Sequence, residues 1–152
     1  MITLEINDDQ AIALFRRLDA ALSDTTPLMD DLGDLLVQST QDRMKAGQQP
    51  DGTPFAPRAQ STLDRYAKLG LSFGQPLNQT GDMHDGISFE AGPDFVIIGS
   101  NEPQAAVMQF GAAAGQFGAH IGKDKLGRDH IHSIPWGDIP ARPFIGLSDE
   151  DL

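Results

Sequence analysis

The sequence lacks cysteine, which excludes disulfide bonds, thiolate metal ligands and a cysteine nucleophile. Basic residues are also scarce: 11 Lys and Arg stand against 22 Asp and Glu, for a formal net charge of −11, and no basic run exceeds Arg16-Arg17. Binding to nucleic-acid backbones relies on clustered Lys and Arg, so we expect no direct nucleic-acid partner. No apolar run approaches the roughly 20 residues of a membrane span, and residues 1–10 lack the basic and apolar regions of a secretory signal. We therefore expect no membrane partner.

Glycine and proline, by contrast, are abundant, with 16 and 10 copies, and most of them follow Gly47. A chain of 152 residues normally forms one domain, so residues 1–152 are expected to form a single domain whose two halves differ in character. The expected fold class is α+β. An N-terminal strand and a helical hairpin would pack on a small, mostly antiparallel β-sheet that carries a long Gly-rich loop.

The N-terminal half shows regular hydrophobic periodicity. Residues 2–6 alternate in the manner of a half-buried strand. A helix is predicted to begin at Asn7 or Asp8 and to end near Ser23, with an apolar stripe formed by Ala11, Leu14, Phe15, Leu18 and Leu22. A second helix is predicted to have Thr26 as its N-cap and Pro27 in its first helical position, and to run to Ala46 and stop at Gly47. Its inner face would consist of Leu28, Leu32, Leu35, Leu36 and Ser39. The short link between the helices permits an αα-hairpin.

The C-terminal half carries short elements separated by turn signals. A helix is predicted over residues 61–69, where Ser-Thr-Leu-Asp resembles a capping box. Strands over residues 87–91 and 95–99 flank a Gly-Pro turn and predict a β-hairpin, and a strand over residues 142–147 is expected to join the same sheet. A short helix over residues 104–110 is apolar almost all round, which predicts that it is buried.

The longest irregular stretch, residues 111–136, holds three of the four histidines. Loops of this length are usually functional or disordered, so we interpret the stretch as a flexible arm that orders on binding. A coiled excursion with a short hairpin is the alternative. His130 and His132 share one face of an extended segment and His120 precedes them, but zinc sites usually contain cysteine or a helical His-Glu-x-x-His pattern. We therefore predict solvated histidines, no metal site and no cofactor.

Other catalytic patterns are also missing from the sequence. Residues 124–129 lack the ligand spacing of an EF-hand. The glycines at 115, 118 and 122 neither follow a strand nor open a helix, so they do not fit a phosphate-binding loop. No nucleophile elbow and no catalytic pair of carboxylates is recognisable. An enzyme is therefore disfavoured.

Near the C-terminus, prolines stand on both sides of one arginine in the stretch Ile139-Pro140-Ala141-Arg142-Pro143-Phe144-Ile145-Gly146-Leu147-Ser148. Proline fixes its own φ and biases the preceding residue toward extended backbone, so Arg142 should lie on a stiff, extended segment. The rigid fork of guanidinium donors suits a carboxylate. Residue types alone therefore predict an edge strand whose Arg142 forms an intramolecular salt bridge.

Five stretches, in the same order, match patterns of one known family. They are residues 51–57 (DGTPFAP), 77–87 (LNQTGDMHDGI), 95–101 (FVIIGSN), 105–111 (AAVMQFG) and 139–148 (IPARPFIGLS). Together they resemble the phage virion morphogenesis, or tail completion, family of Mu-like phages and prophages. A more distant likeness is to head–tail connector and tail-terminator proteins.

This resemblance implies a structural assembly protein that is not an enzyme and that completes the phage tail or joins it to the head. It implies a homo-oligomeric ring, with tail-tube or neck and connector proteins as partners, placed in the virion after assembly in the bacterial cytoplasm. The assembly and structural residues that it singles out are Thr80, Gly81, Gln109, Phe110, Gly111, Pro140, Arg142, Pro143 and Phe144. Arg142 would then reach an acid in its own or a neighbouring subunit.

Two alternatives belong to other functional classes. One is a small metal-dependent hydrolase built on His120, His130 and His132. The other is a host adaptor that binds peptides by strand addition at a sheet edge.

Overall fold

One long helix, α2 (Thr26–Ala46), is the central element of the fold. The computed structural model describes residues 8–123 and 126–152, so the strand predicted over residues 2–6 lies outside the described residues. Proline occupies the first turn of α2, where its missing N–H costs no helical hydrogen bond. The helix ends at Gly47, whose φ of 76° is the left-handed conformation that closes many helices. The predicted end of this helix is confirmed, and its start lies one residue earlier than predicted, with Thr25 in place of Thr26 as the N-cap.

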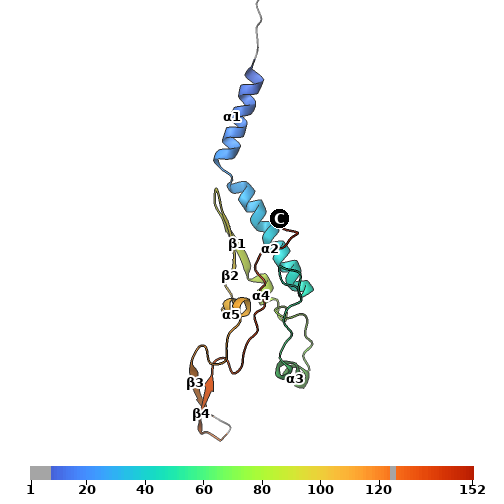
Figure 1. Cartoon of the computed structure of the whole chain (residues 1–152), viewed down its shortest axis with the longest axis vertical. Helices are drawn as coiled ribbons and strands as arrows, with labels where there is room; N and C mark the ends of the chain where they lie inside the picture. Colours follow the sequence, from blue (N-terminus) through green and yellow to red (C-terminus); the bar gives the residue numbers. More distant parts are fainter. Residues whose placement is uncertain (1–7, 124–125) are drawn as a thin grey trace, which may run out of the picture.

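A two-stranded antiparallel sheet packs against α2 (Figure 1). Strands β1 (Ile87–Ala91) and β2 (Val96–Ser100) pair from Ile87 opposite Ser100 to Ala91 opposite Val96. The predicted hairpin is therefore confirmed. Gly33 explains how closely helix and sheet approach, because a Cβ at this position would overlap the ring of Phe89.

The hydrophobic core is small and lies between α2, the sheet and the C-terminal segment. A four-residue helix, α4 (Asp82–Asp85), precedes β1 and turns one methionine into the core. The buried core side chains are Met44, Phe55, Met83, Ile87 and Phe144. Met83 and Ile87 are near each other in sequence, but the other three residues come from distant parts of the chain, so the core is assembled mainly by long-range contacts.

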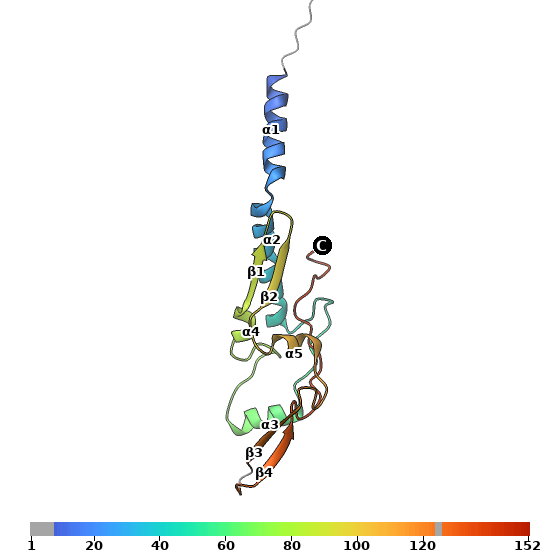
Figure 2. The same ribbon diagram turned by 90° about the vertical axis from the view of Figure 1, so that its left-hand side faces the viewer.

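Helix α1 (Asp9–Ser23) has the bounds predicted from its periodicity, but the predicted helical hairpin is wrong. In both views α1 runs on beyond the end of α2, away from the rest of the molecule (Figures 1 and 2). The Thr25 hydroxyl, in the link between the helices, donates a hydrogen bond to the Pro93 carbonyl in the β1–β2 turn. The link is thus held at the tip of the sheet, and no other described element lies alongside α1.

Two further helices occur where they are predicted, with different surroundings. Helix α3 (Gln60–Lys68) begins after Ala59 without a side-chain cap, so the predicted capping box is not formed. Helix α5 (Ala105–Phe110) contains no fully buried residue, and the Phe110 side chain is 79% exposed. The prediction that this apolar helix is buried is therefore wrong for its C-terminal end.

The stretch 111–136 contains a second hairpin, so the alternative of a coiled excursion with a short hairpin is the one observed. Strands β3 (Ala119–Lys123) and β4 (Asp129–Ser133) pair antiparallel with each other and with no other strand in the described residues. The hairpin lies at the end of the molecule opposite α1 (Figure 2).

The strand predicted over residues 142–147 is not observed. This segment has no regular secondary structure, bends at Ile145 and Gly146 and joins neither sheet; just before it, Ile139 forms an isolated bridge with Ala112. The chain is therefore α+β with two separate small sheets. Within residues 8–123 and 126–152, no helix combines the length and apolar character needed to cross a bilayer.

Candidate assembly site

A glutamine side chain takes the place of a neighbouring strand beside the C-terminal segment. Gln109, on α5, accepts hydrogen bonds at Oε1 from the backbone N–H groups of Phe144 (3.0 Å) and Ile145 (3.1 Å). Its Nε2 donates to the Ile145 carbonyl at 3.0 Å. Backbone groups removed from water need partners, and this amide supplies them. The segment can therefore be held in place without belonging to a sheet.

Arg142 binds backbone carbonyls rather than a carboxylate. Its Nε donates to the Ala56 carbonyl at 2.6 Å and its Nη2 to the Pro57 carbonyl at 2.7 Å, while its backbone N–H donates to the Met108 carbonyl at 2.7 Å. The predicted salt bridge is wrong: among residues 8–123 and 126–152, no carboxylate lies within ion-pair distance of Arg142. The planar fork fits the two consecutive carbonyls of Ala56 and Pro57 in the proline-rich loop.

The side chain of Arg142 is an unusual occupant of the interior, with the whole residue only 7% exposed. Burial, and then the positive charge of Arg58, lower the pKa of Arg142. A buried guanidinium is costly unless its donors are used, which is what the two carbonyls provide. The role of Arg142 in the described chain is therefore to fix the loop 51–57 to the C-terminal segment.

Three of the stretches that carry the family resemblance meet at this point. Residues 51–57 receive the Arg142 guanidinium, and residues 105–111 bind residues 139–148 through Gln109. Phe144 follows directly and is 1% exposed, in the core with Phe55 of the loop. These stretches are far apart in sequence, and their physical connection explains why they act as one structural unit.

Gly111 makes the turn that brings α5 to the C-terminal segment. Its φ of 74° and ψ of 178° belong to a region that only glycine occupies readily. A Cβ here would lie 2.7 Å from the Ile139 carbonyl oxygen and 2.9 Å from the Ala141 nitrogen. These are backbone atoms, and Ile139 is held by two hydrogen bonds to Ala112 of 2.9 and 2.8 Å, so they cannot move aside easily.

We expect Gly111→Ala to lower the free energy of unfolding by about 1 to 3 kcal/mol from backbone strain, with the steric clash in addition. Chemical denaturation measures this loss. Gly118→Ala is the matched control, because Gly118 also has a positive φ, 88°, but a Cβ there would meet no atom within 4 Å. Equal losses in the two variants would show that the contact with Ile139 is unimportant.

A cluster of hydrogen bonds around Asp151, which no sequence pattern indicates, attaches the C-terminal end of the chain to α2. We call it the Asp151 cluster. The Arg43 guanidinium lies 2.8 Å from the Asp151 carboxylate and also donates to the Gly146 carbonyl at 2.8 Å. Ser39 Oγ donates to the same carboxylate at 2.6 Å, and the backbone N–H and hydroxyl of Ser148 donate to it at 2.7 and 2.8 Å. Arg43 and Asp151 are 108 residues apart, and no local pattern links them.

The Asp151 cluster is expected to make the folded protein less stable in acid. Burial alone would raise the pKa of Asp151, but the hydrogen bonds from Ser39 and Ser148 and the charge of Arg43 outweigh it and lower the pKa to about 2. The unfolded-state pKa is near 3.8. The carboxylate therefore contributes stability above that value, which is lost as pH falls toward 2, by about 2 kcal/mol in total.

Denaturation titrations at several pH values test this contribution. Asp151→Asn should be less stable at neutral pH and should lose part of the decline between about pH 5 and pH 2. Asp149→Asn, at an exposed position two residues earlier, should leave the decline as it is in the wild type. If the Asp151→Asn variant shows the full decline of stability in acid, then the Asp151 cluster does not set the acid sensitivity.

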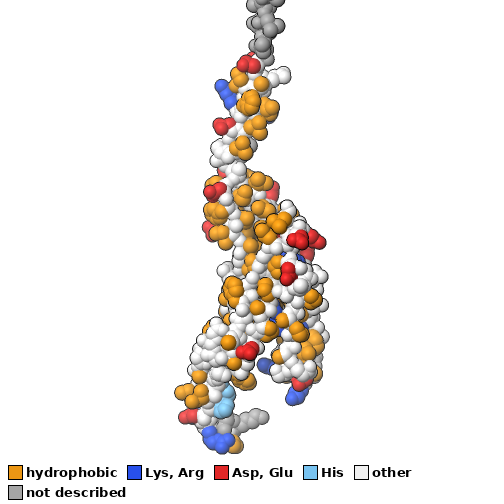
Figure 3. All heavy atoms as spheres, viewed as in Figure 1, with side chains coloured by type: hydrophobic (Ala, Val, Ile, Leu, Met, Phe, Trp, Pro, Cys, Tyr) orange, Lys and Arg blue, Asp and Glu red, His pale blue; other side chains and the backbone are white. Residues whose placement is uncertain are grey.

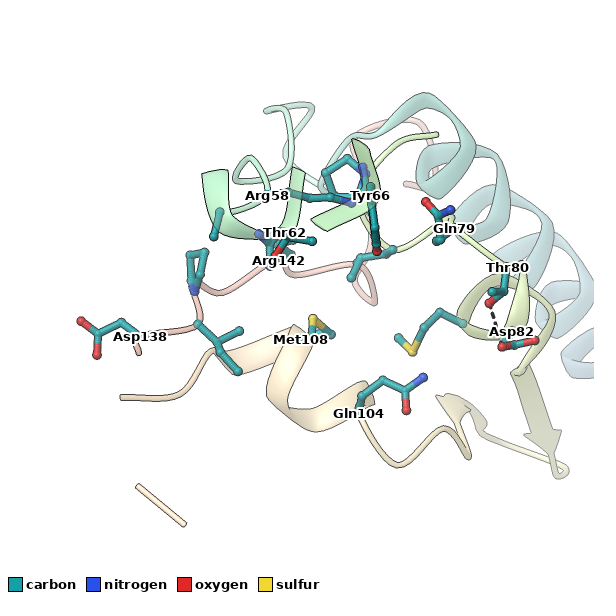
Figure 4. Close-up of a pocket in the computed structure, with 16 residues that line it drawn as sticks. Arg58, Thr62, Tyr66, Gln79, Thr80, Asp82, Gln104, Met108, Asp138 and Arg142 are labelled. Atoms are coloured by element: carbon teal, nitrogen blue, oxygen red, sulfur yellow. Dashed lines mark hydrogen bonds between the residues drawn. The ribbon is translucent and has the colours of Figure 1, made fainter. Parts of the chain in front are cut away.

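A groove of about 440 Å³ lies between α3, α5 and the segment 138–142 (Figure 4). Leu77, Met83 and Met108 give it apolar walls. Arg58 and Arg142 lie along one side of it, between Asp138 at one end and Thr80 at the other, where the Thr80 hydroxyl donates to Asp82 at 2.7 Å.

Arg58 is an element of this groove that sequence reasoning missed. Its Nη1 and Nη2 donate to the carbonyls of Gly74 and Gln75, both at 2.6 Å. Its guanidinium carbon lies 5.9 Å from the centre of the Tyr66 ring and 5.6 Å from that of Phe73, within cation–π range. Arg58 directly follows the DGTPFAP stretch, which is the only local signal that could have indicated it.

Most of the residues singled out by the resemblance come together, and one does not. Gln109, Gly111, Arg142, Pro143 and Phe144 form the junction around the C-terminal segment. Pro140 and Thr80 line the groove beside it, and Gly81 precedes α4. Phe110, by contrast, stands out into solvent at the end of α5.

Three of the four histidines lie on the β3–β4 hairpin. His120 is directly opposite His132, whose ring is stacked on Trp136 at a centroid distance of 5.3 Å and lies 4.3 Å from the ring of His130. In the described part of the chain, no group of three or more His, Cys, Asp or Glu side chains is placed to hold a metal ion. The geometry thus gives the metal-dependent hydrolase no support.

Comparisons with known proteins agree with the family resemblance that the sequence motifs indicated. The phage virion morphogenesis family model matches residues 6–152. The chain is 30% identical to "Mu-like prophage FluMu G protein 2" of Haemophilus influenzae over 152 residues, which cover 99% of this chain and 88% of that protein. It is 29% identical to "Tail completion protein S" of Escherichia phage P2 over 126 residues, which cover 82% and 75% of the two chains. No solved structure matches. Because the family match covers almost the whole chain, this protein belongs to the phage virion morphogenesis family.

Proposed function

We propose that this protein is a structural component that completes the phage tail or joins it to the head, acting as a ring of identical copies and remaining in the tail or neck of the virion. The observation that carries the proposal is the family match over residues 6–152. The relative in phage P2 is named a tail completion protein. We further propose that the protein catalyses no reaction, holds no cofactor and contacts tail-tube or neck and connector proteins.

The shape of the molecule supports a role in assembly. The core is small, and large apolar side chains remain exposed on the two elements at opposite ends of the long axis, α1 and the β3–β4 hairpin (Figures 1 and 2). Exposed apolar surface of this extent is typical of protein–protein contacts. A closed ring requires each copy to present two different surfaces in a head-to-tail manner, and an elongated chain with apolar ends meets that requirement.

The site residues divide into two proposed roles. Gln109, Gly111, Arg142 and Phe144 hold the C-terminal segment rigidly, so that partners meet a preformed surface. Phe110 is proposed to contact a neighbouring virion protein, because its ring is exposed beside this rigid junction.

A complementation experiment tests the function. A phage or prophage whose copy of this gene is deleted should produce heads and tails that are not joined or tails that are incomplete, as seen by electron microscopy. Supplying the wild-type gene should restore complete particles. Phe110→Asp should restore them poorly although the protein remains folded. Normal particles in the deletion strain would contradict the proposed function.

The ring is tested separately on the purified protein. Light-scattering mass at several concentrations should show a defined multiple of the 16.4 kDa chain. A mass equal to one chain at every concentration would contradict the ring, but it would not affect the role in phage assembly.

A further inference from the structure

The groove between α3, α5 and the segment 138–142 contains two guanidinium groups that no carboxylate neutralises. Arg58 is half-buried in its wall, and Arg142 is only 7% exposed. Within residues 8–123 and 126–152, neither arginine forms an ion pair with an acid. Besides burial, the cause that lowers the pKa of Arg142 is the positive charge of Arg58, so the two groups repel each other. An anion between them would relieve this repulsion.

Both arginines have N–H groups left for such an anion. A guanidinium carries five N–H donors on three nitrogens. The carbonyls of the protein take Nε and Nη2 of Arg142, and Nη1 and Nη2 of Arg58. In the described part of the chain, no acceptor is placed on Nη1 of Arg142 or on Nε of Arg58. Each group can therefore bind a carboxylate while it keeps its hold on the backbone.

The acids that line the groove lie at its two ends and have other partners. Asp138, at one end, accepts a hydrogen bond from the Ala114 N–H at 2.9 Å, and Asp82, near the other, accepts one from Thr80 (Figure 4). Between these ends, Met108 forms an apolar wall across from the arginines. An incoming anion is thus directed to the middle of the groove, because the end carboxylates repel it.

A tight turn at the end of the C-terminal segment presents two carboxylates. The Asp151 N–H donates to the Ser148 carbonyl at 3.0 Å, which places Asp149 and Glu150 at the tip of the turn. Both side chains are exposed, and neither forms an ion pair within residues 8–123 and 126–152. The Asp151 cluster fixes the base of the turn, so the two carboxylates are held on a preorganised element.

The turn cannot enter the groove of its own chain as it is placed here. The Asp151 cluster attaches it to α2 through Ser39 and Arg43. In both ribbon views the C-terminal end lies beside α2, whereas α3 and α5 lie further toward the β3–β4 hairpin (Figures 1 and 2). Figure 3 shows acidic side chains at the level of this C-terminal end. The turn and the groove are therefore two different surfaces of one chain, as a head-to-tail contact requires.

We propose that the turn 148–151 of one copy enters this groove of the next copy, where Asp149 and Glu150 bind Arg58 and Arg142. The occupant is thus a second copy of this chain, which supplies the two negative charges that the groove lacks. The inference rests on the proposed ring, for which it names the contact. Complementary charges of this kind fix the register of an interface, and they act more strongly where water is displaced.

Light scattering on the folded protein tests the contact. Asp149→Lys/Glu150→Lys should weaken self-association by about tenfold or more, because two lysines would then face two arginines. Glu90→Lys/Asp94→Lys is the matched control, since it makes the same change of net charge at two exposed acids of the β1–β2 hairpin. A net charge of −11 opposes association, so this control should associate as well as the wild type or better. The Asp149→Asn control of the acid titration is accordingly measured at concentrations where the mass is that of one chain.

The absence of native cysteine allows the contact to be located. Thr62, on α3, lines the groove beside both arginines (Figure 4). A Thr62→Cys chain mixed with a larger, tagged Asp149→Cys chain should form a disulfide-linked heterodimer on mild oxidation, detected by non-reducing electrophoresis. Ser61→Cys replaces Thr62→Cys in the control mixture. Ser61 is exposed and does not line the groove, so its variant should give several-fold less heterodimer.

The outcomes separate the inference from the ring itself. An oligomer that shows neither the cross-link nor the effect of Asp149→Lys/Glu150→Lys overturns this contact and leaves the ring in place. A Thr62→Cys thiol that becomes protected from labelling on assembly, although the lysine variant associates normally, shows that another segment fills the groove and also overturns the inference. A Thr62→Cys/Asp149→Cys chain that cross-links only within itself does the same. A wild-type protein that stays monomeric at every concentration overturns the ring and the contact together.

Discussion

Replacing Phe144 with alanine is expected to lower the free energy of unfolding by about 3 to 5 kcal/mol, the usual cost of truncating a buried phenylalanine. The side chain is 1% exposed and packs in a cluster with only four other buried hydrophobic residues. A small core has few neighbours that could collapse into the space left behind. Since domains are stable by only about 5 to 15 kcal/mol, this single change should remove a large part of the total. Urea denaturation followed by circular dichroism measures it.

Leu147→Ala is the matched control for this prediction, because Leu147 lies in the same segment and is 57% exposed. It should cost less than about 1 kcal/mol. If Phe144→Ala does not fold, Phe144→Leu gives a milder measurement of the same site. A loss in Phe144→Ala no larger than in Leu147→Ala would show that the C-terminal segment does not complete the core.

Replacing Arg142 with alanine is expected to cost about 2 to 4 kcal/mol, because two charge-assisted hydrogen bonds disappear together. The carbonyls of Ala56 and Pro57 would lose their partner, and the loop 51–57 would lose its attachment to the C-terminal segment. Phe55 belongs to this loop and to the core, so the effect should reach the packing as well. Weaker self-association is expected to accompany the loss of stability.

Arg142→Lys should recover only part of the stability, since an ammonium lacks the planar fork that reaches two carbonyls. Arg65→Ala removes an exposed arginine on α3 and is expected to change little. Denaturation and light scattering should be measured on the same samples. If Arg142→Ala keeps both the stability and the oligomer mass of the wild type, the structural role of Arg142 is wrong.

Local patterns predicted the elements well. The bounds of α1 and α2 follow from hydrophobic spacing together with Pro27 and Gly47, and the β1–β2 hairpin follows from two apolar runs around a Gly-Pro turn. These features act over a few residues, so they can be read in sequence order. The motifs around Gln109 and Arg142 likewise indicated the family, which the comparison over residues 6–152 confirms.

Local patterns failed where an outcome depended on a distant partner. Whether Arg142 would meet an acid or a carbonyl depended on a loop 85 and 86 residues away. The short link between the first two helices suggested a helical hairpin, but a short link does not decide whether the two apolar faces meet. The same limit explains the predicted strand at 142–147, whose backbone partner is the side chain of Gln109.

The amino-acid sequence by itself determined the secondary structure of the helices and the first hairpin, the α+β class and the family, because these depend on spacing, turn residues and short motifs. Only the tertiary structure decided that Arg142 and Gln109 hold the C-terminal segment and that Arg43 forms an ion pair with Asp151 near the chain end. It also decided that α1 lies away from the core. The physical reason is that hydrogen bonds and buried contacts between distant residues depend on how the chain returns to itself, which no local pattern records.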